Sequence, residues 1–217
     1  MSGKRLFGSI PLIYLITGGA ATAENFAGKK TKILELIHAA VQTKISLIQI
    51  REKQLPARLL YELVAAAENV TRKTGVKLLV NDRADIALAA GADGVHLASR
   101  SLSADIIKRN FPKNFIVGAS AHTIEKADAA RRQGADFITF SPIYSSPGKG
   151  EPQGIEKLRE VCEHLKPFPV IALGGVDTTN YQAVLEAGAG GFAAIRFLSD
   201  VKNLRRLSAD LGRQKSK

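Results

Sequence analysis

The sequence predicts a single (β/α)8 barrel, the TIM-barrel fold of the α/β class, and three observations support this prediction. Apolar runs of strand character alternate with helical patterns along the chain, which is typical of a parallel sheet. A helix-closing phrase with glycine recurs before three of the expected strands, at Gly91-Ala92-Asp93, Gly134-Ala135-Asp136 and Gly188-Ala189-Gly190. Most apolar runs end in a polar residue or a glycine, as barrel strands do where they reach an active site.

Hydrophobic periodicity predicts eight strands with helices between them. The strands are expected near Leu12–Thr17, Ser46–Ile50, Lys77–Val80, Gly94–Leu97, Phe115–Gly118, Phe137–Phe140, Val170–Leu173 and Gly191–Ile195. The helices are expected around Thr31–Thr43, Pro56–Thr74, Arg83–Ala90, Ser103–Phe111, Thr123–Gln133, Gly154–His164, Thr178–Ala187 and Asp200–Leu211. Pro56, Ser103 and Thr178 carry helix-start signals. An open doubly wound sheet is the alternative, but Gly18-Gly19-Ala20 lacks the spacing of a dinucleotide-binding turn.

One domain is expected over residues 1–217, with residues 1–9 and about 212–217 as frayed ends, because no change of composition marks a second unit. Cys162 is the only cysteine, so no intrachain disulfide forms, and its helical context indicates a core residue. No apolar run is long enough to span a bilayer. These features favour a cytoplasmic protein without a membrane partner, and they leave the oligomeric state open.

The chain has a formal net charge of +11. Nucleic-acid binding would require basic residues clustered on one element with aromatic residues nearby. Aromatic residues make up only 6% of the chain, tryptophan is absent and the basic residues are spread along the sequence. We therefore expect no nucleic-acid partner, and we interpret the cations at strand ends as the lining of a pocket for a phosphorylated substrate.

The end of the second expected strand reads Gln49-Ile50-Arg51-Glu52-Lys53. Because side chains alternate along a strand, Gln49, Arg51 and Lys53 share one face. A guanidinium fork and an ammonium group on one face suit a phosphate or pyrophosphate group. A solvated strand end that pairs with carboxylates would have the same pattern.

The third expected strand ends in Asn81-Asp82-Arg83. Carboxylate and amide oxygens side by side suit Mg²⁺, particularly when the metal also holds phosphate oxygens. In the alternative interpretation, Asp82 caps the next helix and pairs with Arg83 or Arg51.

Two histidines stand at strand ends. Ser120 and His122 follow the fifth expected strand and lie on the same side, where a hydroxyl and an imidazole can bind phosphate or move protons. His96 ends the fourth expected strand and is a stronger functional candidate than His38 and His164, which fall in helical patterns.

The last three strand ends supply a loop and a phosphate site. The segment Ser145–Gly150, which contains Ser146 and Lys149, is a long loop of small polar residues. It either closes over a ligand or stays a mobile surface loop. Gly174-Gly175 follows the seventh expected strand and Ile195-Arg196 ends the eighth. Loops after strands seven and eight of TIM barrels commonly bind phosphate.

Taken together, these segments resemble the superfamily of thiamine-phosphate synthase and its relative, thiazole tautomerase. The segments that carry the resemblance are Gln49–Lys53, Val80–Arg83, Gly91–Leu97, Gly118–Thr123, Pro142–Lys149 and Gly174–Val176. They occur in the same order as in the superfamily, and the resemblance runs from about Tyr14 to Ile195. For the synthase it implies condensation of hydroxymethylpyrimidine pyrophosphate with a thiazole phosphate, giving thiamine phosphate and pyrophosphate.

The resemblance also implies roles for single residues. Those expected to bind the pyrophosphate are Arg51, Lys53, Lys149, Ser120 and Asn81. Those expected to hold the thiazole phosphate are Gly174, Gly175, Ile195 and Arg196. Gln49 would place the pyrimidine and Asp82 would hold Mg²⁺, while His96 and Ser146 are further candidates for substrate contact.

The chain departs from the synthase pattern after His96-Leu97. Synthases have a stretch here that ends in an aspartate, a second Mg²⁺ ligand, whereas this chain has Ala98-Ser99-Arg100-Ser101, so Ser101 stands in that position. Ser146 and Gly148 partly replace threonines, and Arg196 replaces a serine. The Ala98–Ser101 stretch is more similar to the tautomerase branch, in which the histidine at the position of His122 shuttles a proton. We expect thiamine-phosphate synthase activity, with thiazole tautomerase or a catalytically inactive phosphate-binding homologue as alternatives.

Overall fold

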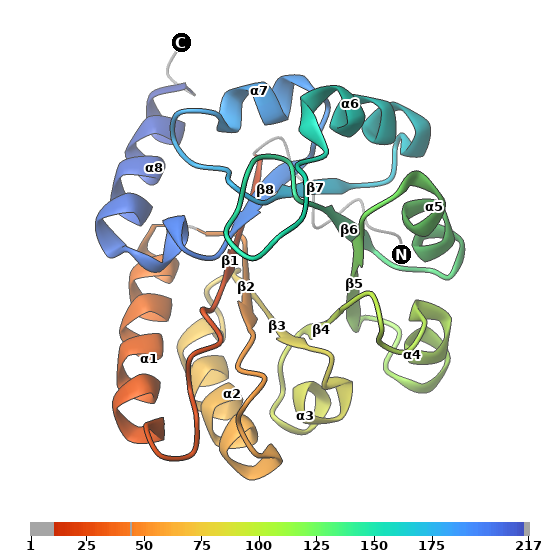
Figure 1. The fold of residues 1–217 in the computed structure, drawn as a ribbon. Coiled ribbons are helices and arrows are strands. Elements are labelled where there is room, and N and C mark those ends of the chain that lie inside the picture. The colour runs from red at the N-terminus through yellow and green to blue at the C-terminus, as the bar shows by residue number, and fades with distance from the viewer. Residues whose placement is uncertain (1–10, 44, 215–217) are drawn as a thin grey trace.

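The described residues of the computed structural model, 11–43 and 45–214, form a closed barrel of parallel strands in the order β1-β2-β3-β4-β5-β6-β7-β8. Figure 1 shows the strands as an inner ring with helices outside it. Each strand pairs with the next along the chain, and β1 closes the barrel against β8. The predicted TIM barrel is confirmed, and the open-sheet alternative is wrong.

The elements alternate throughout. The strands are β1 (Leu12–Ile16), β2 (Leu47–Ile50), β3 (Lys77–Asn81), β4 (Gly94–Leu97), β5 (Ile116–Ala121), β6 (Phe137–Phe140), β7 (Val170–Leu173) and β8 (Gly191–Ala194). The helices are α1 (Phe26–Gln42), α2 (Ala57–Thr71), α3 (Ala84–Ala89), α4 (Ala104–Asn110), α5 (Ile124–Arg132), α6 (Gly154–Leu165), α7 (Tyr181–Glu186) and α8 (Val201–Gln214), with the short 3₁₀ helix η2 (Phe197–Ser199) before α8.

Helix starts differ most from the sequence-based expectations. Helix α1 begins at Phe26, five residues before the expected Thr31, because Gly28 is tolerated inside its first turns. Thr178 is not a helix cap, since the Asp177 carboxylate accepts hydrogen bonds from the N–H and hydroxyl of Thr179 and holds this segment in a turn before α7. Ser103 stands at the N-cap position of α4 but makes no capping hydrogen bond.

The chain ends agree only in part with the expectation. Residues 1–10 and 215–217 lie outside the described residues, so fraying there stays a prediction. Helix α8 extends to Gln214, and Leu204 and Leu207 on it are buried. The backbone is therefore helical as far as Gln214, with Leu204 and Leu207 packed into the core, and Figure 1 shows this helix beside α1.

The core has two layers, as expected for a barrel. One cluster fills the barrel interior with Leu12, Tyr14, Ile16, Leu47, Leu79, Ile116, Phe137, Ile171 and Ala193. The other lies between the strands and the surrounding helices. Both faces of each strand are thus buried, which is why the strands read as continuous apolar runs. Within residues 11–43 and 45–214, no helix is long and apolar enough to cross a bilayer.

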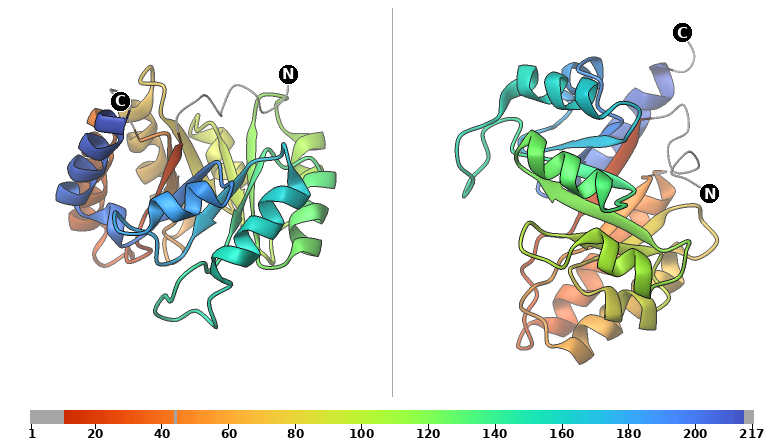
Figure 2. Two further views of the ribbon diagram at one scale, coloured as in Figure 1. Left: turned by 90° about the horizontal axis from the view of Figure 1, so that it is seen from above. Right: turned by 90° about the vertical axis from the view of Figure 1, so that its right-hand side faces the viewer.

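The loop between β6 and α6 is the largest excursion from the barrel. Figure 2 shows it projecting from one end of the molecule, and Figure 1 shows it in front of the barrel opening. Its two ends are fixed by backbone hydrogen bonds from Tyr144 N–H to Gly174 O (3.0 Å) and from Gln153 N–H to Pro142 O (2.7 Å). The loop therefore leaves and re-enters the fold at defined points beside β7.

Candidate active site

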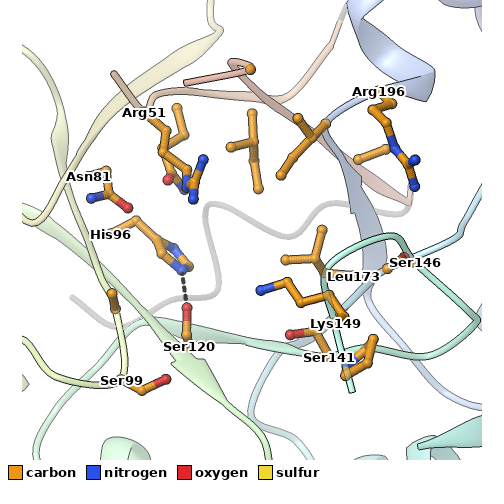
Figure 3. A pocket seen from close by; sticks show the side chains of 18 of the residues that line it. Arg51, Asn81, His96, Ser99, Ser120, Ser141, Ser146, Lys149, Leu173 and Arg196 are labelled. Carbon is orange, nitrogen blue, oxygen red and sulfur yellow. Dashed lines mark hydrogen bonds between the residues drawn. The ribbon is translucent and has the colours of Figure 1, made fainter. Parts of the chain in front are cut away.

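A cavity of about 1140 Å³ opens at the C-terminal ends of the strands. Figure 3 shows part of its lining from close by. All the residues that the sequence analysis placed in the site line this cavity: Gln49, Arg51, Lys53, Asn81, Asp82, His96, Ser101, Ser120, His122, Ser146, Lys149, Gly174, Gly175, Ile195 and Arg196. The barrel thus brings together residues that are far apart in the sequence. Their individual roles stay predictions.

The cations that line this cavity form no ion pair with a carboxylate in the described part of the chain. The cationic side chains on the lining are Arg51, Lys53, Arg100, Lys149 and Arg196, and the acidic ones are Asp82 and Asp177. Among the described residues, none of these cations forms an ion pair, whereas cations elsewhere on the surface do. Unpaired positive charge in a concave site attracts anions. The alternative in which Asp82 pairs with Arg83 or Arg51 is wrong, since Arg83 pairs with Asp85.

At the opposite end of the barrel, cationic side chains form ion pairs with carboxylates. A hollow of about 940 Å³ there is lined by Lys77, Lys108, Asp93 and Asp136 among others. Lys77 pairs with Asp93 at 2.7 Å and Lys108 pairs with Asp136 at 2.6 Å. Lys113 also lines this hollow and forms no ion pair with a described residue, but the cavity at the C-terminal end has five such cations and therefore attracts anions more strongly.

The tip of β2 is fixed from the β1 side. The backbone N–H of Arg51 donates to Thr17 Oγ1 at 2.8 Å. The buried carboxylate of Glu52 accepts hydrogen bonds from Gly19 N–H at 3.1 Å and from Ala21 N–H at 2.8 Å. Glu52 points away from Arg51 because the two are neighbours on a strand end. Sequence reasoning missed Thr17 and Glu52, although an acidic residue directly after a buried strand was a signal.

Gln49 lies deeper, at the floor of the cavity. Its Nε2 donates to the hydroxyl of Tyr14 at 2.7 Å, and both side chains are buried. Burial raises the pKa of Tyr14 far above its ordinary value, so the phenol stays neutral. The hydrogen bond fixes the Gln49 amide at one side of the barrel axis.

Asp82 follows β3 with a left-handed backbone, φ +59°, a conformation that aspartate tolerates better than most residues. Its Oδ1 accepts hydrogen bonds from Ala98 N–H at 2.8 Å and from the hydroxyl of Ser101. Its Oδ2 accepts a hydrogen bond from Asn81 Nδ2 at 2.8 Å. The carboxylate thus connects the end of β3 to the loop that follows β4.

This donor set does not fit a Mg²⁺ site built from the chain's own carboxylates. Both oxygens of Asp82 are already hydrogen-bonded, and Ser101 supplies a neutral hydroxyl as the donor beside it. Among the described residues, no group of three or more acidic, histidine or cysteine side chains is arranged to hold a metal ion. Mg²⁺ sites in proteins rely on carboxylates together with substrate phosphates. Asp82 thus supplies a single carboxylate, and phosphate oxygens of a substrate would have to complete the coordination of Mg²⁺, so its expected role as a metal ligand stays a prediction.

His96 reaches the cavity floor from β4. Its Nε2 lies 3.0 Å from Ser120 Oγ and 3.4 Å from Thr139 Oγ1 (Figure 3 shows the contact with Ser120). Burial lowers the pKa of His96 to about 4, and the nearby charge of Asp82 only partly offsets this effect. The imidazole is therefore neutral near pH 7.

His122 follows the end of β5 and lies next to the end of β6. Its Nδ1 donates to the backbone carbonyl of Ser141 at 2.7 Å. In a neutral imidazole that donates from Nδ1, Nε2 carries the lone pair. Because His122 lines the cavity, this nitrogen can accept or return a proton there.

Gly174 and Gly175 are required by close packing at the tip of β7. A Cβ on Gly174 would lie 2.9 Å from Pro142 Cα, and one on Gly175 would lie 2.6 Å from Tyr144 Cβ. Both residues have positive φ, +103° and +66°. Neither N–H group donates to another described group, so both remain available to an anion in the cavity.

Comparisons with known proteins agree with this arrangement. The model of the thiamine monophosphate synthase family matches residues 13–198. The chain belongs to this family. A relative from Geobacter sulfurreducens is 44% identical over 166 residues, which cover 75% of this chain and 78% of the relative. The thiamine-phosphate synthase of Caldanaerobacter subterraneus subsp. tengcongensis is 38% identical over 175 residues, covering 79% of this chain and 81% of that protein.

A solved structure supports the same family. The thiamine phosphate pyrophosphorylase from Pyrococcus furiosus superposes with a TM-score of 0.77 and 28% sequence identity, covering 92% of this chain and 96% of that one. The thiamine monophosphate synthase family thus accounts for the barrel from β1 to η2.

Proposed function

We propose that this chain is a thiamine-phosphate synthase. It condenses hydroxymethylpyrimidine pyrophosphate with a thiazole phosphate: the bond between the pyrimidine methylene carbon and the pyrophosphate oxygen breaks, and a bond from that carbon to the thiazole nitrogen forms. The products are thiamine phosphate and pyrophosphate. The observation that carries the proposal is the set of unpaired cations around one cavity in a chain of this family.

The leaving group is assigned to Arg51, Lys53 and Lys149. Arg51 offers a planar fork for two phosphate oxygens, and the lysines act as point charges. Charge builds up on the pyrophosphate as its bond to carbon breaks, so fixed cations stabilise the transition state more than the ground state. Ser120 and Asn81 assist as polar groups on the same side of the cavity (Figure 3).

The acceptor phosphate is assigned to the ends of β7 and β8. Gly174 and Gly175 present N–H groups that donate to no other described residue, and Arg196 lines the cavity beside Ile195. Figure 3 shows Arg196 on the side away from Asn81 and His96. Two anion-binding regions in one cavity position the two rings next to each other, which is the main catalytic contribution when bond making needs orientation. Gln49 and Ser146 complete the lining as candidates for ring and phosphate contacts.

One assay tests this proposal. Purified protein is mixed with hydroxymethylpyrimidine pyrophosphate, thiazole phosphate and a series of Mg²⁺ concentrations, and thiamine phosphate is followed by its oxidation to a fluorescent product. Product formation that depends on both substrates supports the synthase. Absence of product at every Mg²⁺ concentration overturns it.

A second candidate function, thiazole tautomerase, is favoured by the geometry of His122. In the neutral imidazole, the hydrogen bond from Nδ1 to Ser141 leaves the lone pair on Nε2, which is the arrangement that a proton shuttle requires. Solvent hydrogen exchange into the carboxylated thiazole phosphate measures this activity. Exchange that is lost in His122→Ala supports the tautomerase, and exchange that is unchanged in this variant rejects His122 as the proton carrier. A chain without either activity would be a phosphate-binding homologue.

A further inference from the structure

We propose that His96 is a positioning residue that does not contact the substrate itself. Its imidazole orients the hydroxyl group of Ser120 so that the Ser120 proton points into the cavity. In this arrangement His96 Nε2–H donates to Ser120 Oγ, and the serine hydroxyl donates in turn to an anionic oxygen of the bound ligand. The proposal rests on the proposed function for the identity of that ligand, a phosphorylated pyrimidine. The hydrogen-bond geometry itself is independent of it.

The imidazole of His96 is locked in place by the barrel interior. Its ring centroid lies 5.8 Å from that of Tyr14 and 5.9 Å from that of Phe137. Residue 118, its partner in the register of β4 and β5, is a glycine. A Cβ on Gly118 would lie 2.7 Å from His96 Nδ1 and 2.4 Å from Phe137 Cζ. The missing side chain thus creates the space in which the ring lies, and the ring cannot turn over without moving aromatic neighbours.

The two ring nitrogens have different surroundings. Nε2 faces the hydroxyls of Ser120 at 3.0 Å and Thr139 at 3.4 Å, which are partners in the register of β5 and β6. Nδ1 is buried and has no hydrogen-bond partner among the described residues. A neutral imidazole carries one N–H and one lone pair. Buried N–H groups are left unpaired more rarely than buried acceptors, so the proton belongs on Nε2 and the lone pair on Nδ1.

This tautomer determines what Ser120 can do. A hydroxyl has one proton to donate, and its oxygen accepts. When His96 donates to that oxygen, the proton of Ser120 is not used inside the barrel. Ser120 is half-buried and lines the cavity, so its proton points to the ligand side. With the opposite tautomer, Ser120 would donate to His96 and would offer the cavity only a lone pair, which repels a phosphate oxygen.

The tautomer can be measured without any activity. Long-range ¹H–¹⁵N spectra distinguish protonated from unprotonated ring nitrogens, and the signals of His96 are those that disappear in His96→Gln. We expect a protonated Nε2 and an unprotonated Nδ1 in the free protein, with Nε2 shifted in Ser120→Ala. A protonated Nδ1, or no response to Ser120→Ala, overturns the proposal.

Kinetics then test the consequence. His96→Leu removes the donor and is expected to lower kcat/KM for the pyrimidine pyrophosphate by about tenfold, the effect of one hydrogen bond. His96→Gln, which keeps a donor at similar reach, is expected to recover most of the loss. In a Ser120→Ala background, His96→Leu should cause no further loss. Multiplicative losses in the double variant reject the positioning role. A wild-type protein without synthase activity refutes the proposed function instead, and the spectra still decide the tautomer.

Discussion

The hydroxyl of Ser101 donates a hydrogen bond to the carboxylate of Asp82, so the loop after β4 is tied to the end of β3. In synthases, the position of Ser101 is expected to hold an aspartate that binds Mg²⁺. Here a neutral hydroxyl stands in that position beside Asp82, and Arg100, its neighbour in the chain, lines the same cavity. The charged side chains that line this cavity are therefore mostly cationic, as the proposed binding of two phosphorylated substrates requires.

The first prediction concerns this substitution. Ser101→Asp should restore a second carboxylate next to Asp82 and tighten binding of Mg²⁺ together with pyrophosphate by about tenfold, because metal affinity rises with the number of charged ligands. Isothermal titration calorimetry of pyrophosphate with and without Mg²⁺ measures the effect independently of turnover. Ser99→Asp is the matched control, since Ser99 lines the same cavity but is not among the described residues that hydrogen-bond to Asp82, which are Asn81, Ala98 and Ser101. Equal gains in both variants would show that only net charge matters.

The second prediction tests the unpaired cations. Arg51→Ala should raise the Kd of pyrophosphate by about 10- to 100-fold, which corresponds to the loss of about 1.5–3 kcal/mol for a charge-assisted hydrogen bond. Arg51→Lys should have a Kd for pyrophosphate between those of the wild type and Arg51→Ala, because lysine keeps the charge and loses the planar fork. Arg83→Ala is the control, since Arg83 pairs with Asp85 and lies outside the cavity lining. A similar loss in Arg83→Ala would mean that long-range charge, not contact, attracts the anion.

The residues of the site could be predicted from the sequence because the barrel topology determines which strand ends lie together. In a parallel barrel, every strand ends at the same face, so Arg51, Lys149 and Gly174 had to meet once the strands were identified. The contacts of Thr17 and Glu52 were not predicted because they span 34 and 31 residues and are made to backbone groups. The position of Glu52 directly after a buried strand was a signal, but it did not identify these partners. The environment of His96 could not be predicted either, because it depends on the register of β4, β5 and β6.

The third prediction concerns the loop that follows β1, whose backbone N–H groups donate hydrogen bonds to Glu52. Glu52→Gln replaces a buried carboxylate, acceptor of two backbone hydrogen bonds, with an amide whose NH₂ group meets a backbone N–H. We expect the free energy of unfolding to fall by about 1–3 kcal/mol, with weaker pyrophosphate binding because this contact also fixes the tip of β2. Urea denaturation followed by circular dichroism measures the change. Glu62→Gln, at a partly exposed ion pair with Lys30, should change stability by less than about 1 kcal/mol. If Glu52→Gln and Glu62→Gln lowered the free energy of unfolding by similar amounts, a special role for Glu52 would be contradicted.

The fourth prediction uses the depressed pKa of His96, which burial lowers from 6.5 to about 4. Between these values the unfolded chain binds a proton at this position and the folded chain does not, so acidification favours unfolding. The contribution of neutral His96 is complete above pH 6.5 and is lost as the pH falls toward 4. It amounts to about 3 kcal/mol over this interval, since one pKa unit corresponds to about 1.4 kcal/mol.

His96→Gln removes this titration, so its free energy of unfolding should fall less steeply between pH 6.5 and pH 4 than that of the wild type. Urea denaturation at several pH values gives both slopes, and the difference between them is the contribution of His96. His38→Gln serves as the control because His38 is exposed, and its slope should match that of the wild type. If His96→Gln kept the wild-type slope, the imidazole would titrate normally in the folded protein. The barrel interior would then admit a charge at this position, and a neutral His96 donor to Ser120 would hold only above the ordinary histidine range.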